Sequence, residues 1–152
     1  MKPIVKLIAA TLTMALLAIT PVQAQEREEG VHYLALYITD KSEAKMTTVL
    51  NVAANATRYY ESIGEELEVR IVAFNAGLHM LREDTSPVLE RLTSFNQSMP
   101  NVAFVACGNT IAGMTRKAGG VAPPIIGFAE HVPAGVVDLM TLQENGWTLI
   151  RP

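Results

Sequence analysis

The sequence has a single cysteine, Cys107, and therefore cannot form a disulfide within one chain. It also lacks the Cys-x-x-Cys, His-Glu-x-x-His, P-loop and Gly-x-Gly-x-x-Gly patterns, which removes the usual signatures of thioredoxin-type, zincin and phosphate-binding chemistry. Basic residues are not in excess, because 12 Lys and Arg stand against 15 Asp and Glu. A mildly acidic domain of this size argues against nucleic-acid binding.

The first 24 residues have the layout of a secretory signal. Lys2 and Lys6 precede a charge-free apolar run over 7–19, and small residues lead to a predicted cleavage after Ala24. Removal of the two lysines changes the formal net charge from −3 to −5. The apolar run is short for a membrane span, which needs about 20 residues. We therefore expect a periplasmic or secreted protein without stable membrane insertion.

The rest of the chain alternates between strand and helix patterns. Residues 25–30 are charged and predict a flexible, solvated tail, and residues 31–152 suffice for one domain. Apolar β-branched runs predict strands, and segments with helical spacing of apolar residues separate them. This order predicts an α/β three-layer, flavodoxin-like sandwich with a mostly parallel sheet of about five strands. The expected strands are 31–38, 67–74, 101–107, 129–132 and 147–150.

Local signals predict where helices begin. Asp40 with Glu43 resembles a capping box, and Ser86 followed by Pro87 is typical of an N-cap and first helical residue. The proline-broken segment 118–128 predicts an exposed loop or a partner-facing edge, with a packed irregular loop as the alternative.

Cys107 stands at the end of the buried strand 101–107, immediately before Gly108, Asn109 and Thr110. Asn109 and Thr110 are good helix N-caps, so the thiol should face the amino end of a helix. Unpaired N–H groups and the helix dipole favour an anion there, which lowers the pKa of a thiol. In parallel sheets, ligands bind at the carboxyl ends of the strands, where 75–77 and 132–133 should also lie.

Other interpretations of the same residues stay open. A free cysteine often packs as a small hydrophobic residue. His79 and His131 are expected near the ligand edge, so a Cys-His hydrolase or a Cys/His metal site is an alternative. We assign no metal ion or cofactor, because three scattered ligands without motif spacing are a weak signal.

Four segments together resemble the DsrE/DsrF-like family, most closely its members with signal peptides. They are 72–78, 104–110, 132–136 and 142–147. The resemblance implies a parallel α/β fold, assembly into trimers or hexamers, and a sulfur-carrier cysteine at Cys107. The segment 118–128 departs from the shorter linker expected of the family.

These residues favour a periplasmic sulfur-carrier or sulfurtransferase-like subunit in which Cys107 accepts sulfane sulfur as a persulfide. Site-shaping positions are Asn75, Gly77, Gly108, Asn109 and Thr110. A sulfur donor or acceptor protein is the expected partner, beside further copies of the chain. The alternatives are a non-catalytic oligomeric protein that binds a small ligand or metal ion at the same edge, and a structural role in which 121–128 is an assembly surface.

Overall fold

The computed structural model describes residues 29–152. The expected signal peptide, 1–24, and residues 25–28 of the expected tail lie outside this range. Within it, no helix is long and apolar enough to cross a bilayer.

Five strands form one sheet in the spatial order β4-β3-β2-β1-β5, and every neighbouring pair is parallel. The prediction of an α/β fold with a mostly parallel sheet of about five strands is confirmed. Strand β3 and the end of β2 are apolar and buried because helices cover both faces of the sheet there. The strands are β1 (Val31–Ile38), β2 (Glu66–Ala73), β3 (Val102–Cys107), β4 (Glu130–Val132) and β5 (Thr148–Ile150).

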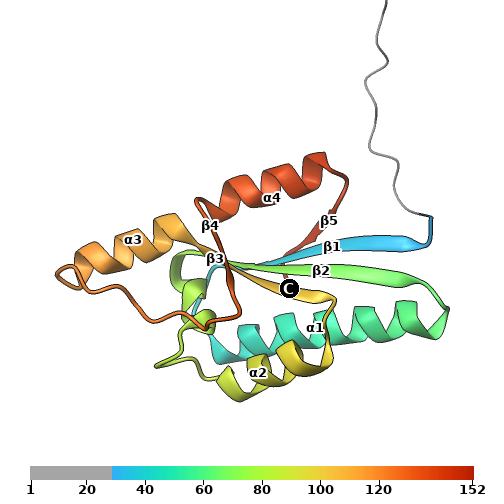
Figure 1. The fold of residues 1–152 in the computed structure, drawn as a ribbon, viewed down its shortest axis with the longest axis horizontal. Helices are drawn as coiled ribbons and strands as arrows, with labels where there is room; N and C mark the ends of the chain where they lie inside the picture. Colours follow the sequence, from blue (N-terminus) through green and yellow to red (C-terminus); the bar gives the residue numbers. More distant parts are fainter. Residues whose placement is uncertain (1–28) are drawn as a thin grey trace, which may run out of the picture.

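The helices lie on both faces of this sheet (Figure 1). Helices α1 (Glu43–Ser62) and α2 (Leu89–Ser98) cover one face, and α4 (Gly135–Glu144) covers the other. Helix α3 (Gly108–Lys117) continues from β3 and projects beyond the end of the sheet. The main core lies between the sheet and α1 and α2, whereas a smaller apolar cluster lies under α4 and includes Leu139.

The helices begin at different residues from those that the capping signals predict. Helix α1 has Ser42 at its N-cap, and the Asp40 carboxylate accepts a hydrogen bond from the Ser42 N–H at 3.1 Å instead of forming a capping box. Helix α2 begins at Leu89, because the Ser86 hydroxyl donates to the Met80 carbonyl at 2.6 Å in the preceding loop. Both polar side chains therefore serve turns and not helix ends.

A short 3-10 helix, η1 (Asn75–Leu81), follows β2. It approaches the end of β1 so closely that Gly77 has no room for a side chain. Segment 118–128 is irregular, with Val121 exposed and Ile126 buried in the main core. The loop is thus exposed at its start and packed near its end.

Candidate functional site

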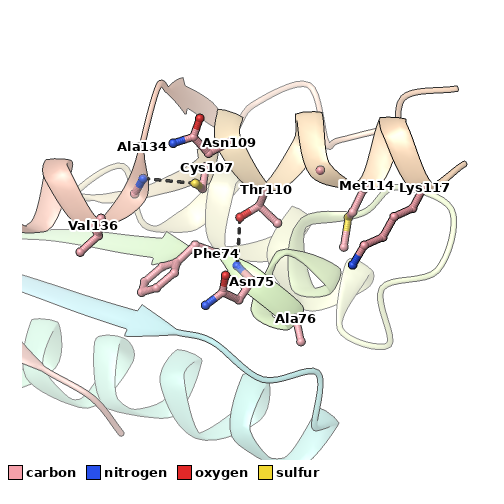
Figure 2. Close-up of a pocket in the computed structure, with 12 residues that line it drawn as sticks. Phe74, Asn75, Ala76, Cys107, Asn109, Thr110, Met114, Lys117, Ala134 and Val136 are labelled. Carbon is pink, nitrogen blue, oxygen red and sulfur yellow. Dashed lines mark hydrogen bonds between the residues drawn. The ribbon is translucent and has the colours of Figure 1, made fainter. Parts of the chain in front are cut away.

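Cys107 lies at the carboxyl end of β3 and occupies the N-cap position of α3. Its side chain is 5% exposed and borders a cleft of about 720 Å³ (Figure 2). The cleft runs between η1, the first turn of α4 and one face of α3. Its lining residues are Phe74, Asn75, Ala76, Cys107, Asn109, Thr110, Gly113, Met114, Lys117, Ala134, Gly135 and Val136.

The surroundings of the Cys107 sulfur favour the thiolate. Burial alone would raise the pKa of the Cys107 thiol, but the Thr110 hydroxyl and the N–H groups of Gly135, Thr110 and Asn109 outweigh it and lower that pKa below its ordinary value. The Gly135 N–H donates to Sγ at 3.2 Å. A thiolate is the nucleophilic form of cysteine, so this geometry activates the residue.

Two helix N-termini meet at this sulfur atom. Helix α3 starts directly after Cys107, and α4 starts at Gly135, which becomes a neighbour because Cys107 pairs with Val132 across β3 and β4. The N–H groups and dipoles of both helices therefore favour a negative charge on the sulfur. Asn109 and Thr110 lie in the first turn of α3 and are not its N-caps, which corrects the sequence-based expectation.

Gly135 lets α4 approach β2 and β3 closely. A Cβ atom there would lie 3.2 Å from Val72 Cγ1, 3.3 Å from Cys107 Cβ and 3.4 Å from Phe74 Cβ. Gly135 was not predicted as a residue of the site. Its signal was a glycine directly after Pro133 and Ala134 at the start of a helix, and only the sheet order shows what that glycine approaches.

An ion pair holds α4 against the sheet near this contact. Arg70 on β2 binds Glu130 on β4 at 2.8 Å and Asp138 in the first turn of α4 at 3.6 Å. Arg70 Nε and Asp138 Oδ2 are buried and have no hydrogen-bond partner within residues 29–152. The buried Leu139 side chain of α4 packs in the apolar cluster with Val72 and Val105 of the sheet.

Asn75, at the start of η1, lines the cleft across from α3. Its backbone N–H donates to the Thr110 hydroxyl oxygen at 3.0 Å, which joins η1 to α3 (Figure 2). Asn75 has a φ of 51°, a left-handed conformation that asparagine adopts more readily than most residues. The Thr110 hydroxyl thus links the backbone of Asn75 to the Cys107 sulfur.

This backbone conformation gives a stability prediction. We expect Asn75→Ala to lower the free energy of unfolding by about 1 kcal/mol, because alanine pays the left-handed penalty in full. Asn75→Gly should stay within about 0.5 kcal/mol of the wild type, since glycine accepts a positive φ. Urea denaturation of the two variants measures the difference. Equal stability of both would contradict the assignment of strain at this residue.

The other predicted site-shaping residues also lie at this edge. Asn109 lines the cleft, and its backbone N–H donates to the Pro133 carbonyl at 3.0 Å. A Cβ at Gly108 would lie 3.0 Å from the Val132 carbonyl oxygen, so this glycine lets α3 start against the end of β4. Gly77 is buried behind the cleft and does not line it.

The two histidines predicted near the ligand edge lie outside the cleft lining. His79 contacts the Thr85 hydroxyl at 3.3 Å. His131 lies on β4, where it pairs with Ala106 of β3. Neither lines the cleft. Among residues 29–152, no group of three or more His, Cys, Asp or Glu residues is placed to hold a metal ion.

Comparison with known proteins gives the fold but no family. The protein of unknown function MTH1491 from Methanobacterium thermoautotrophicum is similar in structure, with a TM-score of 0.67 and 23% sequence identity. The match covers 80% of this chain and 99% of that chain. No protein-family model matches the sequence, and no curated protein matches it either. The likeness to MTH1491 therefore shows a shared fold alone.

The far end of the cleft holds two residues that sequence reasoning did not assign to it. Met114 and Lys117 project from the same side of α3 as Thr110 (Figure 2). Met114 follows Thr110 by four residues, and Lys117 follows Met114 by three. This spacing is visible in the sequence and places the three residues on one helix face. Only the fold shows that this helix face borders a cleft.

Proposed function

We propose that this protein is a sulfur carrier in which Cys107 accepts sulfane sulfur as a persulfide. The observation that carries the proposal is a buried thiol at the base of an open cleft, with its pKa lowered by hydrogen-bond donors from two helix starts. A packing cysteine needs neither the cleft nor these donors. The resemblance of segments 72–78 and 104–110 to DsrE/DsrF-like proteins supports the same chemistry.

The proposed step balances without an outside oxidant. The Cys107 thiolate attacks the terminal sulfur of a donor persulfide, R–S–SH, and forms a new S–S bond with it. The S–S bond of the donor breaks, and R–S⁻ leaves with the bonding electron pair. The Cys107 sulfur is oxidised while the departing sulfur is reduced, and the transferred sulfur keeps its proton. The same N–H groups that favour the thiolate would stabilise the persulfide anion.

Export and assembly belong to the same proposal. The signal-like segment 1–24 supports a periplasmic or secreted location, and the resemblance supports a homo-oligomer, either trimer or hexamer. Exposed Val136, Val137 and Met140 on α4, each 56% exposed, support a partner-facing surface beside the cleft.

Intact mass tests the carrier role directly. The wild-type protein, incubated with a small persulfide or with inorganic polysulfide, should gain the mass of one sulfur atom and lose it on mild reduction. Cys107→Ser should gain none, because the accepting thiolate is absent. If the wild-type protein gains no sulfur and its thiol resists alkylation until the protein unfolds, Cys107 is a packing residue and the proposal is wrong.

A further inference from the structure

The cleft extends well beyond the sulfur atom. Its volume of about 720 Å³ falls in the range of sites for organic small molecules, roughly 300 to 1,000 Å³. An inorganic sulfide or short polysulfide has only a few atoms, each comparable to a water molecule, which occupies about 30 Å³. The sulfur step alone therefore does not account for the size of this cleft.

The cleft has one cationic side chain. Apart from the Cys107 thiolate, Lys117 is the single charged side chain among the twelve lining residues, and no carboxylate is among them. Within residues 29–152, the Lys117 amino group makes no ion pair or hydrogen bond. The cleft therefore presents an unpaired cation to whatever fills it.

The carboxylate that shares a second hollow with Lys117 is already engaged. Lys117 also borders a second hollow of about 370 Å³, in which Asp84 is the carboxylate of the lining. Arg82 holds that carboxylate through two hydrogen bonds of 2.9 and 2.6 Å, and these bonds keep the pKa of Asp84 below its usual range. Lys117 thus remains available to a ligand.

The positions of the two functional groups define the shape of the ligand. Thr110, beside the sulfur, and Lys117 are separated by seven residues, or about 10 Å along the axis of α3. The wall between them is formed by Gly113 and Met114 on α3 and by Ala76 on η1, none of which carries a polar side chain. A matching ligand has a sulfur group at one end, an uncharged middle and an anionic group at the other end.

We infer that the sulfur donor is an organic persulfide carrying a carboxylate, which Lys117 binds while the terminal sulfur meets Cys107. This inference rests on the proposed function, and it makes Lys117 a specificity-determining residue. The departing thiolate R–S⁻ keeps its carboxylate, so Lys117 would bind donor and product alike. A lysine in the last turn of a helix also offsets the helix dipole, and the test must separate that role from ligand binding.

A matched pair of donors tests the inference. The persulfides of N-acetylcysteine and of N-acetylcysteine amide differ only in the carboxylate. We expect the wild-type protein to accept sulfur about fivefold faster from the carboxylate donor at low salt, and the preference should shrink as salt is added. Sulfur gain at Cys107, followed by mass spectrometry over time, is the readout.

Two variants identify the origin of the preference. Lys117→Gln should accept sulfur from both donors at the same rate. Arg116→Gln removes one charge from the same helix end but not from the cleft lining, so it should retain the wild-type preference. Loss of the preference in both variants would indicate a general electrostatic effect and overturn the assignment to Lys117.

Inorganic polysulfide separates this inference from the proposed function. Loading by polysulfide without any preference between the organic donors would overturn the carboxylate specificity and leave the carrier role intact. If the wild-type protein loads from none of the three donors, both the carboxylate specificity and the carrier role are wrong. Equal preference in the wild type and Lys117→Gln would assign the selectivity to another part of the molecule.

Discussion

Gly77→Ala is expected to lower the free energy of unfolding by about 3 kcal/mol, the upper part of the usual range for overpacking. The added Cβ would lie 2.2 Å from the carbonyl oxygen of Ile38 and 2.8 Å from the backbone nitrogen of Thr39. These are backbone atoms, and the Ile38 carbonyl also accepts a hydrogen bond from the Phe74 N–H at 3.2 Å. Relief of the overlap must therefore move η1 away from the end of β1.

Urea denaturation of Gly77→Ala and Gly113→Ala provides the comparison. Gly113 lies inside α3, where an added Cβ meets only the Arg116 guanidinium at 3.8 Å. Alanine is a better helix former than glycine, so Gly113→Ala should be neutral or stabilising by up to about 1 kcal/mol. A Gly77→Ala protein with an unchanged unfolding midpoint would show that η1 does not need its close contact with β1.

Thr110→Val is expected to slow alkylation of Cys107 at pH 7 by about tenfold. Among the contacts that lower the pKa of Cys107, the Thr110 hydroxyl contributes most, while burial, which raises that pKa, remains in the variant. A hydrogen bond to a charged group contributes about 1.5 kcal/mol or more, and each pKa unit changes the thiolate fraction about tenfold. The pH profile of alkylation should therefore shift toward higher pH.

The lowered pKa of Cys107 also makes the free energy of unfolding depend on pH, because proton binding and folding are linked. The pKa of Cys107 in the folded chain lies below its ordinary value of 9.0, so ionisation of the thiol stabilises the fold above that pH. This contribution is lost as the pH falls through the folded-state pKa. Thr110→Val should consequently lose more stability at alkaline pH than at neutral pH.

Thr115→Val serves as the control for the alkylation experiment. Its hydroxyl donates to the Ile111 carbonyl at 2.9 Å on the same helix, and the residue does not line the cleft. Its alkylation profile should match that of the wild type. A Thr110→Val protein that reacts as fast as the wild type at every pH would contradict the role of this hydroxyl.

Sequence patterns predicted the architecture because the determinants of the sheet are repetitive. Apolar runs formed β1 and β3, a partial alternation of apolar and polar residues formed β2, and the placement of Cys107 at a strand end followed from the Gly108 that interrupts its run. Helix starts were less predictable. The N-cap positions Ser42, Val88 and Cys107 make no side-chain capping hydrogen bond, so capping preferences carried little information in this chain.

The site was predictable only where its residues are close in sequence. Asn109 and Thr110 could be assigned because they follow Cys107 directly, and they do line the cleft. Gly135 could not be found in this way, because its contact depends on β4 lying beside β3 in the sheet. His79 and His131 were placed near the cleft from chain order alone, but neither lines it.

The hydrogen bond between Gly135 and Cys107 joins residues 28 positions apart. Thr110 can reach the sulfur as soon as the first turn of α3 forms, but the Gly135 N–H arrives only when the three-residue strand β4 has paired with β3. Until that pairing, the cysteine lacks part of the environment that makes it acidic. The low pKa of the Cys107 thiol therefore depends on the pairing of β4 with β3, and loss of that short strand alone would raise the pKa without touching α3.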